Sequence, residues 1–170
     1  MIFNVVILGV VVFLLFILSM VWPPDSPWAP WWRTNTKTAK AICRIANITQ
    51  KDMVYDLGCG DAEVLIQAAK LGARGVGIEI DPLRVLTARL RIFKNGLRNL
   101  LQIKRSNFFN EDISQASVVI VYLVPVALNR LLPKFKKELK KGTRIVSFRY
   151  EMNMKNIKED KNNKLYLYTI

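Results

Sequence analysis

The residues best suited to chemistry surround two glycines, Gly58 and Gly60, which follow a short apolar segment. A glycine after a strand permits backbone angles that other residues resist, and it lets a ligand approach the main chain closely. Glu79 ends the next apolar segment about twenty residues later, the distance at which a carboxylate can accept the hydroxyls of a ribose. The spacing therefore predicts a nucleoside site at the carboxyl ends of two strands, where open α/β sheets bind ligands.

Acidic side chains give this glycine turn an unusual charge. Asp56, Asp61 and Glu63 all lie in or beside it. A dinucleotide fingerprint has a third glycine at the position that Glu63 occupies, and a carboxylate there would repel a pyrophosphate. Acids suit instead a ligand that carries an ammonium and a sulfonium. S-adenosylmethionine is such a ligand, and we expect it to be the cofactor.

The elements that must position these residues alternate between helix and strand from Thr34 onward. Asp81 is a typical N-cap before Pro82 at the first helical position. The apolar segment 118–123 has no polar position, which is typical of a central strand in a parallel sheet. We expect helices at 36–48, 62–71, 82–93 and 126–139, and strands at 53–57, 75–80, 100–104, 118–123, 143–148 and 165–170. This alternation predicts a three-layer α/β sheet.

The amino-terminal segment has a different composition. No charged residue precedes Asp25, and Asn4 and Ser19 are the only polar side chains in 2–22. A helix of about 20 residues is about 30 Å long, which matches a bilayer core, so we expect 1–22 to be a transmembrane helix. A buried core helix and a cleaved signal peptide are the alternatives. The first keeps a polar stripe and the second begins with basic residues, and neither feature is present.

Segment 23–35 is rich in proline and tryptophan, which predicts a stiff juxtamembrane linker with an aromatic belt at the headgroup level. Alternatively, some of the indole rings pack on the domain. All 26 Lys and Arg residues lie from Arg33 onward, against 13 acidic residues in the whole chain. The positive-inside tendency then predicts a single-pass membrane protein whose domain, 36–170, lies in the cytoplasm.

Some chemistry is excluded by composition. The chain has no His and only two Cys, Cys43 and Cys59. A His-based catalytic triad and a His-ligated zinc site are therefore impossible, and two cysteines cannot form a disulfide framework. We assign no metal, and we expect Cys59 to be a small buried residue without a chemical role.

The glycine turn and the acid after it resemble a known family. The segment 56–62 (DLGCGDA) resembles the glycine-rich motif of class I S-adenosylmethionine-dependent methyltransferases, and 77–81 (GIEID) resembles their acidic second-strand motif. The resemblance covers about 34–170. It implies a Rossmann-like methyltransferase sheet of seven strands, mostly parallel with an antiparallel last strand.

By position, the resemblance also implies cofactor-binding residues. Asp56, Gly58 and Gly60 would line the methionine moiety and Glu79 would hold the ribose hydroxyls. Residues beside the adenine would be Asn107 and Phe108. Two positions depart from the family pattern: Ala62 stands where a third glycine is common, and Asn107 where an Asp is frequent.

A narrower resemblance concerns the segments 27–30 (PWAP), 118–125 (VVIVYLVP) and 144–150 (RIVSFRY). They are similar to stretches in small membrane-anchored lysine methyltransferases that modify the ATP synthase c subunit and the adenine nucleotide translocase. Tyr122 and Pro125, at the end of the fourth strand, occupy the place from which this fold usually touches its acceptor. Tyr122 would accept a hydrogen bond from the amine or line its channel; alternatively, its ring only packs.

These observations predict a methyltransferase at the membrane surface that transfers methyl to a lysine amine of a protein, itself membrane-associated. The net charge of +13 predicts attraction to an anionic membrane surface. One alternative is methylation of a small molecule or a lipid, and another is a non-catalytic basic module that binds a membrane surface or nucleic acid. A nucleic-acid partner is disfavoured because basic residues interleaved with exposed aromatics are not evident.

Overall fold

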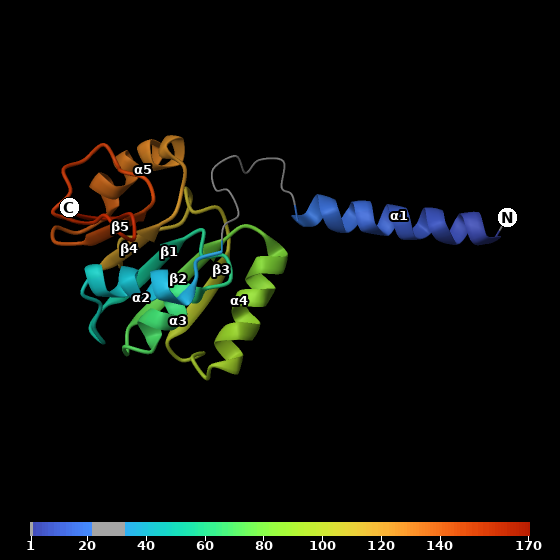
Figure 1. The fold of residues 1–170 in the computed structure, drawn as a ribbon, viewed down its shortest axis with the longest axis horizontal. Coiled ribbons are helices and arrows are strands. Elements are labelled where there is room, and N and C mark those ends of the chain that lie inside the picture. The colour runs from blue at the N-terminus through green and yellow to red at the C-terminus, as the bar shows by residue number, and fades with distance from the viewer. Residues whose placement is uncertain (1, 22–32) are drawn as a thin grey trace.

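The computed structural model describes residues 2–21 and 33–170. Its helices and strands are, in chain order, α1 (Ile2–Val21), α2 (Thr36–Ile45), β1 (Met53–Leu57), α3 (Glu63–Ala69), β2 (Arg74–Glu79), α4 (Pro82–Lys94), β3 (Leu101–Arg105), β4 (Val118–Val121), α5 (Pro125–Glu138), β5 (Arg144–Phe148), β6 (Lys158–Asp160) and β7 (Leu165–Thr169). Figure 1 shows the strands between helices in a compact domain, from which α1 projects.

The seven strands form one sheet in the order β3-β2-β1-β4-β5-β7-β6. Neighbouring strands are parallel except at β7, which runs antiparallel to β5 and β6. Leu57 lies beside Ile78 of β2 and Val121 of β4, so the carboxyl ends of these three strands meet at one edge. The predicted Rossmann-like sheet with an antiparallel last strand is confirmed.

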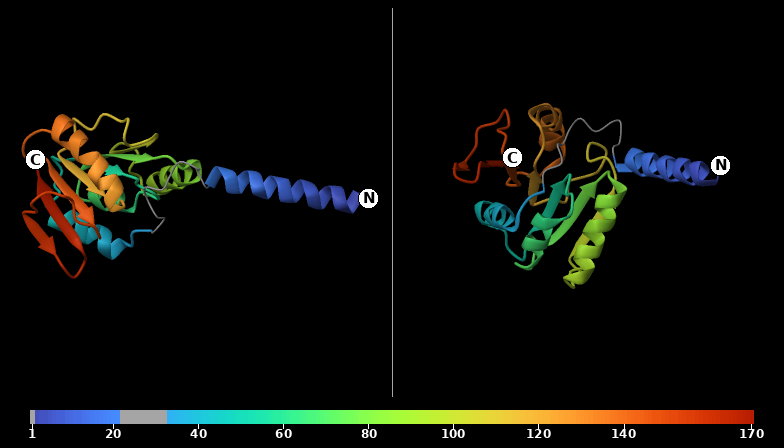
Figure 2. Two further views of the ribbon diagram at one scale, coloured as in Figure 1. Left: turned by 90° about the horizontal axis from the view of Figure 1, so that it is seen from above. Right: turned by 45° about the vertical axis from the view of Figure 1, so that its right-hand side comes forward.

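Side chains alternate between two cores because successive residues of a strand point to opposite faces. In β1, Val54 packs with α2, α3 and α4, whereas Tyr55 and Leu57 pack with α5. Three helices thus cover one face and one helix the other, as the turned views show (Figure 2). On the side of α5, the irregular segments 106–117 and 149–157 complete the cover with Ile113 and Met152.

Local sequence explains most element boundaries. Asp81 caps α4 as predicted: its Oδ1 accepts the backbone N–H groups of Leu83 and Arg84 at 2.8 and 3.0 Å. Helix α2 ends at Ile45, three residues before the predicted end, and Asn47 then takes a left-handed φ of 51°. The strand β6, which belongs to a basic segment, was not predicted.

The amino-terminal segment is helical as predicted, but its assignment as a transmembrane helix is not supported. Residues 2–21 are helical, as α1. Across the described residues, however, we find no helix with the length and apolar character that a membrane crossing requires. Residues 23–32 of the predicted linker, and residues 1 and 22 of the predicted transmembrane helix, lie outside the described residues.

Candidate cofactor and acceptor site

The turn after β1 is held against β2 by its own backbone. The N–H groups of Gly58 and Cys59 both donate to the Ile78 carbonyl, at 2.8 and 3.1 Å. Gly58, Gly60 and Ala62 have φ angles of 84°, 54° and 63°. Ala62 therefore adopts the left-handed conformation that a glycine would take at that position. The other two positions carry glycine, which adopts this conformation most readily.

Space remains open above the two glycines. A Cβ built on Gly60 meets no heavy atom of the described residues within 4 Å, and one on Gly58 meets only Leu123 Cδ2, at 3.7 Å. The backbone angle rather than crowding by the protein therefore favours glycine here. The same measurement shows that the turn adjoins the end of β4.

Glu79 is buried at the end of β2, and three backbone amides orient its carboxylate. Its Oε2 accepts the N–H of Gly60 at 3.0 Å, and its Oε1 accepts those of Ile80 and Asp81 at 2.8 and 3.0 Å. A carboxylate has about four acceptor positions. The free position on Oε2 is next to the glycine turn, where a ligand hydroxyl can donate to it.

Asp56 is buried at the end of β1, on the same edge of the sheet. Burial raises the pKa of Asp56 to about 7, and the nearby charges of Glu79 and Asp61 contribute. A cation bound beside this carboxyl group would favour its charged form. Asp56 is thus a candidate partner for an ammonium group. The fraction of Asp56 side chains that carry a charge changes around neutral pH.

The other two acids of the turn point to arginines. Arg91 of α4 contacts both Asp61 and Glu63, and Arg33 donates to Asp61 Oδ2 at 2.6 Å. Glu63 Oε1 also accepts hydrogen bonds from Thr36 Oγ1 and Gln67 Nε2, each at 2.9 Å. Although burial opposes it, hydrogen bonds led by that of Arg91 lower the pKa of Glu63.

This arrangement corrects the sequence interpretation of the turn. Glu63 was interpreted as a charge that repels phosphate, and Asp61 as part of an acidic ligand site. Both charges are balanced within the protein and join α2, α3 and α4. Asp56 and Glu79 alone remain as the carboxylates of this turn that are not paired with a described cation.

The predicted adenine-binding residues follow β3 at the same edge. The N–H of Ser106 donates to the Glu79 carbonyl at 3.0 Å, which places the next two residues beside the end of β2. Asn107 is exposed and its Oδ1 accepts the Phe109 N–H at 3.0 Å. The Phe108 ring lies 4.6 Å from that of Phe109. Sequence reasoning missed Ile80, whose apolar side chain is 38% exposed directly after Glu79. The sequence signal that could have found it is an apolar residue placed just beyond the end of a buried strand.

The predicted acceptor residues follow β4. Tyr122 is half-buried, and its ring centroid lies 4.5 Å from that of Phe148. Its hydroxyl accepts a hydrogen bond from Arg149 at 3.0 Å, a contact that sequence reasoning missed. Pro125 is exposed at the first position of α5. The structure thus brings Tyr122 to the edge that carries the glycine turn, with a cation beside its hydroxyl.

The cysteines are buried and unpaired. Burial raises the pKa of Cys43 to about 12 and also raises that of Cys59. A Cβ at Gly77 would lie 2.6 Å from Cys59 Sγ, so the thiol packs directly over β2. Within the described part of the chain, no group of acids and cysteines could hold a metal ion.

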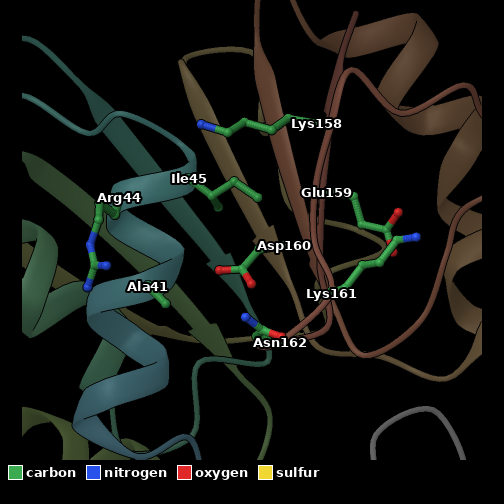
Figure 3. Close-up of a pocket in the computed structure, with 8 residues that line it drawn as sticks. All are labelled: Ala41, Arg44, Ile45, Lys158, Glu159, Asp160, Lys161 and Asn162. Atoms are coloured by element: carbon green, nitrogen blue, oxygen red, sulfur yellow. The ribbon is translucent and has the colours of Figure 1, made fainter.

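A hollow of about 390 Å³ lies elsewhere, between α2 on one side and β6 with the turn after it on the other (Figure 3). Arg44, Lys158 and Lys161 line it together with Glu159 and Asp160. Hydrogen bonds from Asn163 lower the pKa of Asp160. None of the predicted site residues lines this hollow, and its charges of both signs are suited to solvent rather than to an apolar ligand.

The sheet order, the glycine turn and the two carboxylates Asp56 and Glu79 define a class I S-adenosylmethionine-dependent methyltransferase. The chain matches a family model, the ANTKMT methyltransferase domain, over residues 56–159, and it belongs to that family. It is 40% identical to a protein-lysine N-methyltransferase of Saccharolobus islandicus (strain REY15A), over 89% of this chain and 98% of that protein. The predicted class is confirmed.

Two further similarities bear on cofactor and acceptor. The chain is 28% identical to the human lysine N-methyltransferase of the ATP synthase c subunit, over 71% of this chain and 52% of that protein, so it spans about half of that relative. A crystal structure of an RNA methyltransferase from Salinibacter ruber in complex with S-adenosyl-L-homocysteine superimposes with a TM-score of 0.79 and 34% identity, covering 82% of this chain and 94% of that one. S-adenosylmethionine is thus confirmed as the cofactor.

Proposed function

We propose that this protein transfers methyl groups from S-adenosylmethionine to lysine side chains of a protein substrate. The observation that carries the proposal is the 40% identity, over nearly the whole length of both chains, to a protein-lysine N-methyltransferase. The glycine turn with Asp56 and Glu79 supports the cofactor half of the proposal, because the two carboxylates lie at the edge where this fold binds ligands.

Each site residue then has a distinct role. S-adenosylmethionine supplies an electrophilic methyl group on a sulfonium. Asp56 would hold the ammonium group, Glu79 would accept a ribose hydroxyl, and Gly58 and Gly60 would allow close approach of the main chain. Asn107, Phe108 and the exposed face of Ile80 would border the adenine. Positioning and exclusion of water lower most of the barrier of such an in-line displacement, so a strong base is not required.

The acceptor amine must be neutral to react. The nitrogen lone pair forms the new bond to carbon, the carbon–sulfur bond breaks with its electron pair going to sulfur, and an amine proton leaves to solvent. A lysine of pKa about 10.4 is almost fully protonated at neutral pH. Arg149, beside the Tyr122 hydroxyl, would disfavour a protonated amine at this point and favour loss of its proton.

The variant Tyr122→Phe separates the two interpretations of this side chain. It keeps the ring that packs on Phe148 and removes the hydroxyl. If the hydroxyl contacts the amine, kcat falls by about ten-fold, the effect of losing one hydrogen bond of about 1.4 kcal/mol in the transition state, while cofactor affinity is unchanged. An unchanged kcat would show that the ring only packs. Tyr166→Phe, at a half-buried tyrosine of β7, is the matched control.

The acceptor is tested by incubating the full chain with labelled S-adenosylmethionine and three substrates: a cell protein extract, the same extract with its lysines acetylated, and total RNA. We expect label in the first and not in the second or third. The RNA arm is included because the superimposed Salinibacter ruber protein is an RNA methyltransferase. Label in RNA, or label in the lipids extracted from the first reaction rather than in its proteins, would overturn the lysine proposal.

We also propose that α1 holds the enzyme at a membrane, as a single-pass anchor with the catalytic domain in the cytoplasm. Every large apolar side chain from Ile7 to Ile17 is exposed, on all sides of the helix, which is unfavourable in water. A membrane-held protein would then be the substrate. Recovery of the full chain in the membrane fraction, with the domain cleaved by protease added to the cytoplasmic face, is expected; recovery in the soluble fraction would contradict this location.

A further inference from the structure

The outer face of α4 carries an apolar stripe that the described protein does not cover. Leu83, Leu86, Leu90 and Phe93 recur at spacings of three and four residues and are 45–59% exposed. The opposite face of the helix, with Val85, Ala88 and Ile92, is buried against the sheet. Soluble surfaces rarely align four large apolar side chains in this way. The stripe therefore requires an explanation other than packing within the domain.

Basic side chains border this stripe, and α4 contains no acidic residue. The Arg98 guanidinium lies 4.9 Å from the Phe93 ring centroid, and Lys94 is exposed at the end of the helix. Arg89 donates to the Ile103 carbonyl at 3.0 Å along the other border. An apolar stripe with cations along its borders is the pattern of a helix that lies in a membrane interface.

The position of α4 is continuous with that of α1. The two helices contact each other, and Figures 1 and 2 show α1 leaving the domain on the side where α4 covers the β3 end of the sheet. Apolar surface is thus exposed on both elements and on the same side. Helix α4 also begins soon after Glu79, behind its capping Asp81, so any surface it binds lies near the cofactor rim.

We propose that the outer face of α4 docks on an anionic lipid surface, with the leucine stripe at the acyl boundary and its basic borders at the headgroups. A second copy of this chain fits less well, because two such stripes face to face would bring their basic borders together. The proposal deepens the membrane location proposed above and rests on it. It does not depend on the identity of the methyl acceptor.

Site-specific fluorescence on the full chain tests the docking. An environment-sensitive thiol-reactive dye is attached to Leu90→Cys and, as the matched control, to Leu71→Cys; the two leucines are 50% and 51% exposed. The native cysteines are buried and do not compete for the dye. With vesicles of phosphatidylcholine and phosphatidylserine, we expect a blue shift of emission at position 90 and none at 71.

Further variants keep the result specific. In the labelled Leu90→Cys chain, Leu86→Glu should abolish the shift, and Lys94→Glu with Arg98→Glu should weaken it, as should vesicles of phosphatidylcholine alone. Methylation of a soluble protein by the Leu86→Glu variant should match that of the wild type. Lys70→Glu, an exposed change on another element, should leave the shift intact.

Each contrary outcome has a defined meaning. Failure of the full chain to float with vesicles would overturn the membrane location and the docking together. Flotation with a water-exposed label at 90 would overturn the docking alone, and equal shifts at 90 and 71 would indicate general adsorption and overturn it too. A blue-shifted label at 90 without vesicles would also overturn the docking, because it would show that protein rather than lipid covers the stripe. A shift that depends on protein concentration would indicate a second copy of the chain, and a shift that does not would indicate segment 22–32.

Discussion

The two ends of the glycine turn carry acids with opposite surroundings. At the inner end, Asp56 and Glu79 are oriented by burial and by backbone amides. At the outer end, Asp61 and Glu63 are oriented by Arg33 and Arg91. Negative charge in a turn therefore does not by itself indicate a ligand site. Carboxylates whose charge is already balanced hold the helices together, whereas those not paired with a cation remain available to a ligand.

The largest effect on cofactor affinity is expected for Glu79→Ala. The change removes an acceptor from three backbone amides and from the ribose, and each unsatisfied buried donor costs about 1–3 kcal/mol. We expect affinity for S-adenosylhomocysteine to fall by about 100-fold or more, measured by isothermal titration. Glu159→Ala, an exposed acid of β6, is the control. A change in affinity of less than about three-fold would show that Glu79 does not bind the cofactor.

Asp56→Asn should have a smaller effect on affinity that depends on pH. In the wild type the charged form of Asp56 increases as pH rises through about 7, so affinity for the cationic amino group should increase over pH 6–8. We expect the variant to bind about ten-fold more weakly at pH 8 and to lose this dependence. An identical pH profile in both proteins would contradict the role given to Asp56.

The same titration has the opposite sign for stability. The pKa of Asp56 is raised in the folded chain, so the folded state holds its proton more tightly than the unfolded state between about pH 4 and pH 7. Without cofactor, the free energy of unfolding should therefore fall as pH rises through this window, by up to about 4 kcal/mol. Urea denaturation at several pH values measures this, and Asp56→Asn should flatten the curve.

The smallest effect on affinity is expected for Glu63→Ala at the outer end. The variant loses bonds to Thr36, Gln67 and Arg91, and the partly exposed Arg91 is left without its partner. We expect the free energy of unfolding to fall by about 2 kcal/mol after discounting solvent screening. Affinity of the folded protein should stay within about two-fold. A loss of affinity as large as that of Glu79→Ala would erase the distinction between the two ends.

Much of the fold is encoded locally, and those parts were predicted. The boundaries of β1 and the start of α4 follow from glycine, proline and a capping Asp81, each of which acts on its neighbours. Strand β6 could not be predicted, because 158–160 are charged and the strand exists only through pairing with β7. The end of α2 was misplaced because nothing in residues 46–48 is a strong helix breaker.

The roles given to the site residues stay predictions, and the contacts of their side chains could not be predicted from the sequence. The arginine partners of Asp61 and Glu63 lie 28 to 30 positions away in the chain. The raised pKa of Asp56 likewise depends on burial that only the assembled sheet produces. The contact between Arg149 and Tyr122 joins two strand ends and leaves no local signal. Spacing thus predicts which residues meet at this edge of the sheet, whereas the partner of each charged side chain requires the tertiary structure.

Binding of the cofactor by Glu79 and Asp56 is tested most directly by a crystal structure with S-adenosylhomocysteine. We predict a ribose hydroxyl within about 2.7 Å of Glu79 Oε2, the usual length of such a hydrogen bond, and the ligand amino group beside Asp56. A ligand bound elsewhere, or one whose ribose makes no contact with Glu79, would contradict the account.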